Sequence, residues 1–221
     1  MRSLSRRQRA ALLIPFLLIP STAFVFVTGS QFMGPQAGYL LGFLFYWIVW
    51  CLLAPILLLG VGSTASLFHE EHRLFQRSNL IPAALLVVIL VVTVVMYPPS
   101  RLAAASTGLL IIAIPVAVIN GIAEEILWRG VYVSMYPDSI PLTVIYPSLG
   151  FALWHITPQL VFPAESGIWS LVISTFFLGI SYGWIAFRTR SVRWPVIAHS
   201  IGGVLSLGGF IAPSIQALLG L

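Results

Sequence analysis

Seven apolar blocks, each about long enough to cross a bilayer as a helix, fill most of this 221-residue chain. Short segments rich in proline and glycine, such as 29–36 and 97–101, separate the blocks and interrupt helices. The blocks cover residues 10–28, 38–62, 80–97, 102–136, 142–162, 168–187 and 194–219. The sequence therefore predicts an all-α fold, a polytopic transmembrane helix bundle of about seven spans, within bounds of about six to eight.

The composition places the chain in the membrane. Only 8% of the residues are charged and 59% are hydrophobic, whereas a soluble domain carries about 25% charged residues. Such a chain cannot cover a water-facing surface, so we expect an integral membrane protein surrounded by the lipid bilayer. The net charge of +5 is a poor indication of nucleic-acid binding, and no nucleic-acid partner is expected. No linker separates domains, which predicts a single membrane domain over residues 1–221. The lone Cys51 excludes an intramolecular disulfide and is interpreted as a packing residue.

The arginines indicate the orientation of the chain, because basic residues collect on the cytoplasmic side of short loops. With the N-terminus in the cytoplasm, Arg101 lies in an outer loop and Arg129 lies within a span. The remaining basic residues then lie on the cytoplasmic side: Arg2, Arg6, Arg7, Arg9, Arg73, Arg77, Arg188, Arg190 and Arg193. We therefore predict a cytoplasmic N-terminus and, for seven spans, a C-terminus on the opposite side.

Three ionisable residues in the fourth block are the first candidates for chemistry, because charged groups inside a bilayer are costly and usually functional. Glu125 and Arg129 lie four residues apart on one helix face and can form an ion pair. Glu124 points about 100° away and is left without that partner. A desolvated carboxylate beside a second one suits proton transfer near neutral pH, which makes Glu124 the preferred general base or acid. The alternative is that both glutamates only hold helices together.

Two histidines in later blocks are the next candidates. His155 follows Phe151 by one helical turn, and a turn at 136–141 joins its helix to that of Glu124 as an antiparallel hairpin. Counting residues from this turn places Glu124 and His155 within about 5 Å in depth. His199 follows the basic loop closely, so we expect it to lie shallower unless its helix tilts or a cavity opens to the cytoplasm. The alternative for either histidine is a hydrogen-bonded packing role.

The other polar groups fit no known catalytic pattern. Glu165 and Asp138 are expected in a solvated loop and a turn. His69 and His72 are three residues apart, so they do not form the H-E-x-x-H zinc site. The chain also lacks the G-x-S-x-G turn of serine hydrolases.

The three elements, in this order, resemble the CAAX protease and bacteriocin-processing family (CPBP, or Abi) of glutamate-dependent intramembrane proteases, which includes type II CAAX prenyl endopeptidases. The family pattern is E-E-x-x-x-R, then F-x-x-x-H, then H-x-x-x-N/D on separate membrane helices. Residues 124–129 match the first motif, residues 151–155 match the second, and His199 matches the start of the third. Gly203 stands where the family has Asn or Asp. The resemblance covers residues 104–205, the expected catalytic motif region.

The resemblance implies an endopeptidase whose cavity opens to the cytoplasm. In it, Glu124 would activate a water with help from His155, and His199 would help to stabilise the tetrahedral oxyanion. The residues implied to orient these groups are Glu125, Arg129 and Phe151. Without a side chain at Gly203, either another donor such as Ser200 substitutes or activity is weakened.

The implied partner is a membrane protein or peptide substrate: a CAAX-type prenyl protein, a peptide precursor or a C-terminal sorting signal. The sequence does not choose among these, and it does not set the oligomeric state. No cofactor or metal is expected. We expect the protein in a prokaryotic inner or plasma membrane, with its active site facing the cytoplasm.

Three alternatives remain open from the sequence. The nearest is a zinc-dependent variant in which Glu124, His155 and His199 hold the metal. A non-catalytic membrane scaffold or bacteriocin-immunity protein is favoured by Gly203. A small proton-coupled transporter is the third, although no inverted repeat of broken helices supports it.

Overall fold

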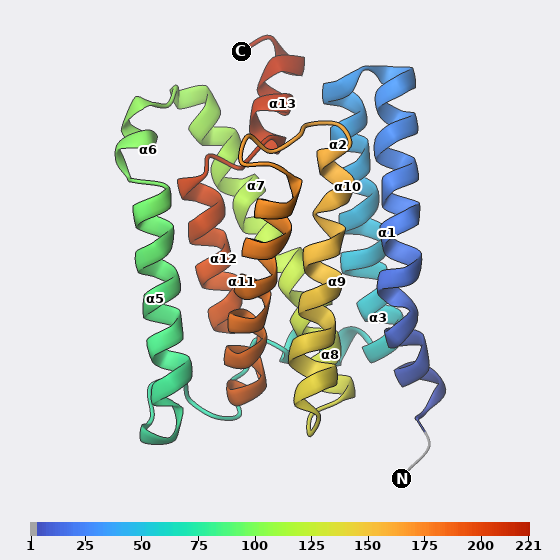
Figure 1. Cartoon of the computed structure of the whole chain (residues 1–221), viewed down its shortest axis with the longest axis vertical. Helices are drawn as coiled ribbons and strands as arrows, with labels where there is room; N and C mark the ends of the chain where they lie inside the picture. Colours follow the sequence, from blue (N-terminus) through green and yellow to red (C-terminus); the bar gives the residue numbers. More distant parts are fainter. Residues whose placement is uncertain (1–3) are drawn as a thin grey trace.

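The computed structural model describes residues 4–221, and every regular element in that range is a helix. The helices pack side by side as a bundle, with the first residues of α1 and the last residues of α13 at opposite ends of it (Figure 1). An odd number of membrane crossings requires this placement. The all-α bundle predicted from the sequence is therefore confirmed. The cytoplasmic position predicted for Arg2 falls outside the described residues.

A helical hairpin opens the chain at one edge of the bundle (Figure 1). Its elements are α1 (Arg6–Met33), α2 (Pro35–Phe45), the π-helical η1 (Tyr46–Leu53) and α3 (Ala54–Leu59). Ser5 and Gln8 form a capping box that starts α1, and Gly34, with a φ of 86°, makes the turn into α2. The two helices touch at Gly38, where an added Cβ would lie 2.1 Å from the backbone nitrogen of Ser30.

The opposite edge of the bundle is α5, which contacts α11 and α12 (Figure 1). The chain reaches this edge from α4 (Val61–Ser66), which contacts α3. The elements at the edge are the 3₁₀ turn η2 (Arg77–Asn79), α5 (Leu80–Met96) and α6 (Ser100–Ala104). Large side chains of α5 point away from the protein, with Val87, Val91 and Val95 55%, 57% and 73% exposed. An apolar face of this kind is covered by lipid in an integral membrane protein.

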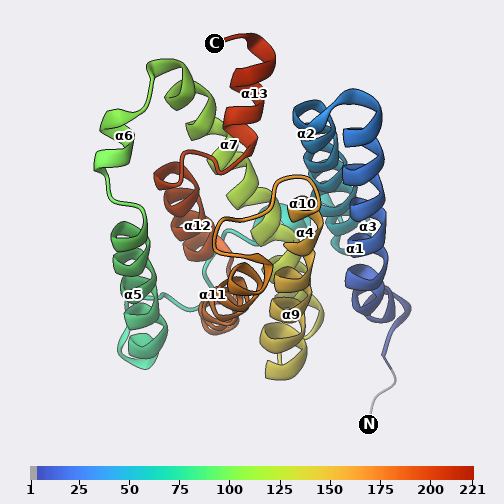
Figure 2. The same cartoon turned by 45° about the horizontal axis from the view of Figure 1, so that its top comes forward.

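The central strut of the bundle is a continuous run of helix that crosses it from one end to the other (Figures 1 and 2). It consists of α7 (Thr107–Glu125), the π-helical η3 (Ile126–Gly130) and α8 (Val131–Met135). After a short turn the chain returns through η4 (Pro141–Ile145), α9 (Tyr146–Trp154) and α10 (Ile156–Gln159). This is the antiparallel hairpin that the sequence predicts around residues 136–141.

The last part of the chain packs against the central strut. Its helices are α11 (Ile168–Thr189), α12 (Arg193–Leu205) and α13 (Ile211–Leu219). α12 makes its largest contact with α7, and α11 packs on α9. Between α12 and α13 the backbone leaves the helical region, with positive φ at Leu207, Gly208 and Gly209.

Within residues 4–221, five helical runs are long and apolar enough to cross a membrane: Arg6–Met33, Pro35–Leu59, Arg77–Ala104, Thr107–Met135 and Ile168–Thr189. The other two predicted spans, at 142–162 and 194–219, are each helical in two pieces. The first is interrupted at His155, and the second at residues 206–210. With these two broken segments the count agrees with about seven spans.

The main core lies between α1, η1, η3 and α9. Its largest members are aromatic: Tyr46, Trp128 and Trp154 are all fully buried. Tyr46 stacks on Trp154 at 3.9 Å between ring centroids and accepts a 2.8 Å hydrogen bond from the indole of Trp128. Cys51 belongs to the same cluster, as its predicted packing role requires. This core fixes the helix carrying the two adjacent glutamates against the helix carrying His155.

Candidate active site

The two adjacent glutamates lie at the end of α7, where the helix continues into the π-helical turn η3. Glu124 is 1% exposed and Glu125 is 0% exposed. A buried carboxylate requires compensation by opposite charge or hydrogen bonds. π-Helical turns are rare and are found frequently at functional sites. The chemistry open to Glu124 and Glu125 therefore depends on which charged or hydrogen-bonding groups contact their carboxylates.

Glu125 forms the ion pair predicted from its spacing. Its Oε1 accepts a hydrogen bond from Nη1 of Arg129 at 3.0 Å, and both side chains are buried. The guanidinium also lies over two aromatic rings, 4.4 Å from the centroid of Phe151 and 5.4 Å from that of Tyr182. Cation–π contacts of this kind stabilise a desolvated cation. These contacts hold the Arg129 guanidinium in one position beside Glu125.

His199 bridges the two glutamates from α12. Its Nδ1 donates to Oε1 of Glu125 at 2.8 Å, and its Nε2 lies 3.4 Å from Oε2 of Glu124. Two carboxylates thereby face one guanidinium and one imidazole, so a doubly protonated His199 balances the charge. We call Glu124, Glu125, Arg129 and His199 the buried charge cluster. Within this cluster His199 is the partner of Glu124, which could not be identified from the sequence.

The depth expected for His199 is corrected by the turn that precedes α12. Sequence distance from the basic loop places His199 shallower than Glu124, yet the two side chains are in contact. Ser191 and Val192, in that turn, are each 1% exposed, and the Ser191 hydroxyl and the Val192 amide both donate to the carbonyl of Leu67. The segment after α4 therefore covers this turn, although Arg193, the first residue of α12, is itself exposed.

Small residues set the close contact between α7 and α12. A Cβ added to Gly121 would lie 2.6 Å from the Ser200 hydroxyl, and one added to Gly203 would lie 2.8 Å from the Cβ of Ala117. Glycine allows helix backbones in a membrane to approach this closely. The approach brings His199 within reach of both glutamates. It also leaves no space at position 203 for a longer side chain in the present packing.

His155 ends α9 and joins the site through an aromatic ring. Its Nδ1 donates to the carbonyl of Phe151 at 2.8 Å, and its ring lies 4.6 Å from the Phe151 ring, edge to face. The Phe151 ring is 6.3 Å from that of His199. Phe151 therefore stands between both histidines and Arg129. No hydrogen bond or ion pair within residues 4–221 links His155 to a glutamate.

Two tyrosines at the site have no sequence motif. The ring of Tyr182, on α11, stacks against His199 at 5.9 Å and also faces Arg129. Tyr46, on η1, supports Trp154 and Trp128 beside the candidate residues. An aromatic residue in an apolar block is usually a core residue, so only the packing of distant helices reveals these positions.

The remaining acidic residues lie away from the buried charge cluster. Glu165 is in an exposed loop, and Asp138 is 96% exposed, 3.6 Å from Arg190. Both agree with the solvated positions predicted for them. Glu70 accepts a hydrogen bond from the Trp194 indole and is 13% exposed, so it stabilises the start of α12.

The zinc variant does not fit this arrangement. Both ring nitrogens of His199 face glutamate oxygens, and Nδ1 of His155 donates to a carbonyl. In the part of the chain from residue 4 to 221, no three His, Cys, Asp or Glu side chains gather in a way that could hold a metal ion. We therefore derive no step through a metal.

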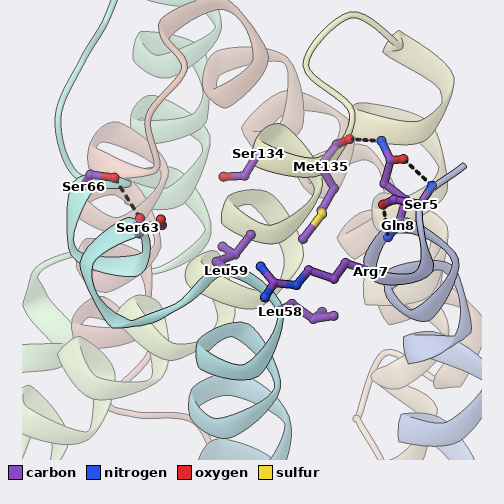
Figure 3. A pocket seen from close by; sticks show the side chains of 9 residues that line it. All are labelled: Ser5, Arg7, Gln8, Leu58, Leu59, Ser63, Ser66, Ser134 and Met135. Atoms are coloured by element: carbon purple, nitrogen blue, oxygen red, sulfur yellow. Dashed lines mark hydrogen bonds between the residues drawn. The ribbon is translucent and has the colours of Figure 1, made fainter.

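A surface pocket of about 510 Å³ lies elsewhere, between the start of α1, the end of α3, α4 and the end of α8 (Figure 3). Arg7 extends beside Leu58 and Leu59 in this pocket (Figure 3). The complete lining is Ser5, Arg7, Gln8, Leu58, Leu59, Ser63, Ser66, Ser134 and Met135. None of these is a residue of the candidate site, so the pocket is separate from it.

Together the fold and the site define a class: a polytopic helical membrane protein with paired glutamates, an arginine and two histidines gathered among its helices. Residues 105–205 match the family model described as Type II CAAX prenyl endopeptidase Rce1-like. This match confirms the family resemblance carried by the three motifs and contains every one of their residues. Over this stretch, which is a little less than half of the chain, the protein is similar to a family of CAAX-type endopeptidases. No curated protein and no solved structure matches the chain.

Proposed function

We propose that the protein is an intramembrane endopeptidase that cleaves a membrane-associated protein or peptide with a water activated by Glu124. The observation that carries the proposal is the buried charge cluster, placed inside an apolar helix bundle. Placing four ionisable groups inside a membrane costs free energy, so residues of this kind are usually kept for a function. The family match supports the same reaction class.

Glu124 is the proposed general base because one of its oxygens has no partner. Oε2 faces His199, whereas Oε1 is buried and accepts no hydrogen bond from residues 4–221. A water bound to Oε1 would transfer a proton to Glu124 while its oxygen attacks the carbonyl carbon of the scissile peptide bond. Collapse of the tetrahedral intermediate then breaks the C–N bond, and Glu124 returns the proton to the leaving amine. The products are a carboxylic acid and an amine.

His155 is proposed to assist this water. Because its Nδ1 carries the proton donated to the Phe151 carbonyl, neutral His155 has a lone pair on Nε2. Such a nitrogen can accept a hydrogen bond from the water and orient it. Both His155 and His199 keep part of their surface exposed, in contrast to the buried glutamates. The site is therefore reached from the histidine side.

Glu125 and Arg129 are proposed to position the reacting groups. Glu125 holds Nδ1 of His199 and is neutralised by Arg129, so the imidazole is oriented toward Glu124. The Phe151 ring holds the Arg129 guanidinium in place through a cation–π contact. Preorganised charges of this kind cost no reorganisation during the reaction.

The substrate is proposed to enter the bundle from the membrane with its scissile bond near the cytoplasmic side. A prenyl group or a hydrophobic sorting helix would both partition into lipid before entry. The protein is proposed to lie in a prokaryotic inner or plasma membrane. The substrate classes to be tested are CAAX-type prenyl proteins, peptide precursors and C-terminal sorting signals.

The test is cleavage of a panel of tagged substrates from these classes in membranes that contain equal amounts of each variant. Wild type should cleave at least one class, and Glu124→Gln and His155→Ala should abolish that cleavage while the protein still folds. Glu165→Gln, in the exposed loop, is the matched control and should keep full activity. Full activity of Glu124→Gln would overturn the mechanism.

The missing side chain at Gly203 favours one second candidate, a non-catalytic scaffold or immunity protein. In that case wild type would bind a membrane peptide without cleaving any class in the panel. The same experiment therefore separates the two functions.

A further inference from the structure

Hydrolysis of a peptide bond by water places a negative charge on the carbonyl oxygen. The site must present at least one hydrogen-bond donor, about 2.7–3.1 Å from the oxyanion, to stabilise that charge. Most donors of the candidate site are already engaged. Both nitrogens of His199 face carboxylates, Nδ1 of His155 donates to a carbonyl, and Nη1 of Arg129 donates to Glu125. Nη2 of Arg129 has no hydrogen-bond partner within residues 4–221, but it is fully buried.

Positions 200 and 203 on α12 do not supply the donor either. Gly203 has no side chain, and the direction of its missing Cβ is filled by Ala117. The Ser200 hydroxyl is buried at the contact with Gly121 and has no hydrogen-bond partner among the described residues. It is wedged between two helix backbones, where a substrate carbonyl cannot reach it.

Asn120 lies one helical turn before Glu124 on the same face of α7. Residues four apart differ by about 40° around a helix, and their Cβ atoms are about 5–6 Å apart. Gly121 and Ala117 mark the side of α7 that touches α12, whereas Val116 belongs to the core cluster that includes Tyr46 on η1. Asn120 falls between these two directions, so it and Glu124 border the same space between α12 and η1.

The amide of Asn120 is fixed in one orientation by Trp47. The indole N–H of Trp47, on η1, donates to Oδ1 of Asn120 at 2.8 Å. An indole nitrogen is a donor only, so the oxygen must face Trp47 and the NH₂ group must point away from it. The NH₂ group makes no hydrogen bond within residues 4–221 and is not among the buried polar atoms without a partner. It is a preoriented, accessible donor one turn from the general base.

From this geometry we propose that Asn120 is a catalytic residue, whose side-chain NH₂ donates a hydrogen bond to the oxyanion of the tetrahedral intermediate. Trp47 is its positioning residue. The inference rests on the proposed function and adds an accessible hydrogen-bond donor to the site. Glu124 takes the proton from water as before, and the Asn120 N–H keeps its own proton throughout.

The test measures kcat and KM for the substrate cleaved best by wild type. Asn120→Asp keeps an oxygen for Trp47 but has no N–H in its ionised form, and Asn120→Leu removes the donor without adding charge. Loss of one oxyanion donor lowers kcat about 100-fold to 1000-fold, and we expect this in both variants with KM changed less than threefold. Trp47→Phe, which releases the amide but keeps its NH₂, should lower kcat by a smaller factor. Ser200→Ala is the matched control and should leave both constants unchanged.

The outcomes separate this inference from the function on which it rests. Loss of cleavage in Glu124→Gln, together with kcat within threefold of wild type in both Asn120 variants, overturns the role of Asn120 alone. Full activity of Glu124→Gln, or absence of cleavage by wild type, overturns both proposals. A thermal unfolding midpoint for each variant, close to that of wild type, excludes loss of fold as the cause of a lower kcat.

Discussion

Replacing Gly203 by alanine should separate the two helices that hold the buried charge cluster together. The new Cβ would lie 2.8 Å from the Cβ of Ala117 and 3.2 Å from its Cα. Part of this overlap is with backbone-attached atoms of α7, so no side-chain rotation relieves it. α12 must therefore move away from α7, and His199 moves with it.

The magnitude follows from two opposing terms. Alanine is a better helix former than glycine by about 0.5–1 kcal/mol, and overpacking of a tight contact costs about 1–3 kcal/mol. Gly202→Ala is a matched control in the same helix, because its Cβ would meet only Cγ2 of Thr93 at 3.6 Å, an ordinary contact. The propensity term is common to both variants. We therefore expect Gly203→Ala to be about 1–3 kcal/mol less stable than Gly202→Ala.

The assay is thermal unfolding in detergent followed by tryptophan fluorescence, with substrate cleavage measured in parallel. Gly203→Ala should unfold several degrees below Gly202→Ala and cleave more slowly. Adding Ala117→Gly removes the nearest atom and should restore part of both losses. Equal unfolding midpoints for Gly203→Ala and Gly202→Ala would refute the packing argument. If Ala117→Gly restored neither stability nor cleavage to Gly203→Ala, α7 and α12 would not meet at this point.

Three further predictions concern other contacts. Arg129→Ala should lower the unfolding free energy by about 3–5 kcal/mol, because it leaves two buried carboxylates facing a single imidazole. Arg101→Ala, at an exposed position, should change little, and similar midpoints for the two variants would contradict this. Gly38→Ala should prevent folding of the α1–α2 hairpin, because its Cβ would lie 2.1 Å from a backbone nitrogen, while Gly62→Ala, with no atom within 4 Å, should express and unfold as wild type does. Cleavage should persist after treatment with a strong zinc chelator, and activity lost to the chelator and restored by zinc would show that a metal takes part.

Local sequence pattern was sufficient for the parts of the protein that depend on one helix or one turn. Apolar blocks predict the helices, since a bilayer accepts backbone only when its hydrogen bonds are made internally. The spacing of four residues predicts the Glu125–Arg129 ion pair, because residues four apart are neighbours on the surface of a helix. The short turn at 136–141 is enough to predict the hairpin that follows α8.

Contacts between helices could not be predicted in this way. The sequence distance from the basic loop makes His199 shallow, and only the burial of Ser191 and Val192 places it against Glu124. In a membrane, hydropathy does not set how helices pack, because lipid is as apolar as the side chains. Small residues such as Gly121 set it instead, and their partners lie on another helix.

By itself, the sequence determined the class of fold, the apolar spans, the ion pair within α7 and η3, and the motifs that carry the family resemblance. Only the tertiary structure decided that His199 contacts both glutamates and that Ala117 fills the space beside Gly203. It also decided that a hydrogen bond from Trp47 orients the amide of Asn120. The physical reason is the range of the interactions. Helix formation and spacing within a helix are local, whereas the orientation of a catalytic group depends on neighbours from distant parts of the chain, whose positions are fixed only when the helices pack.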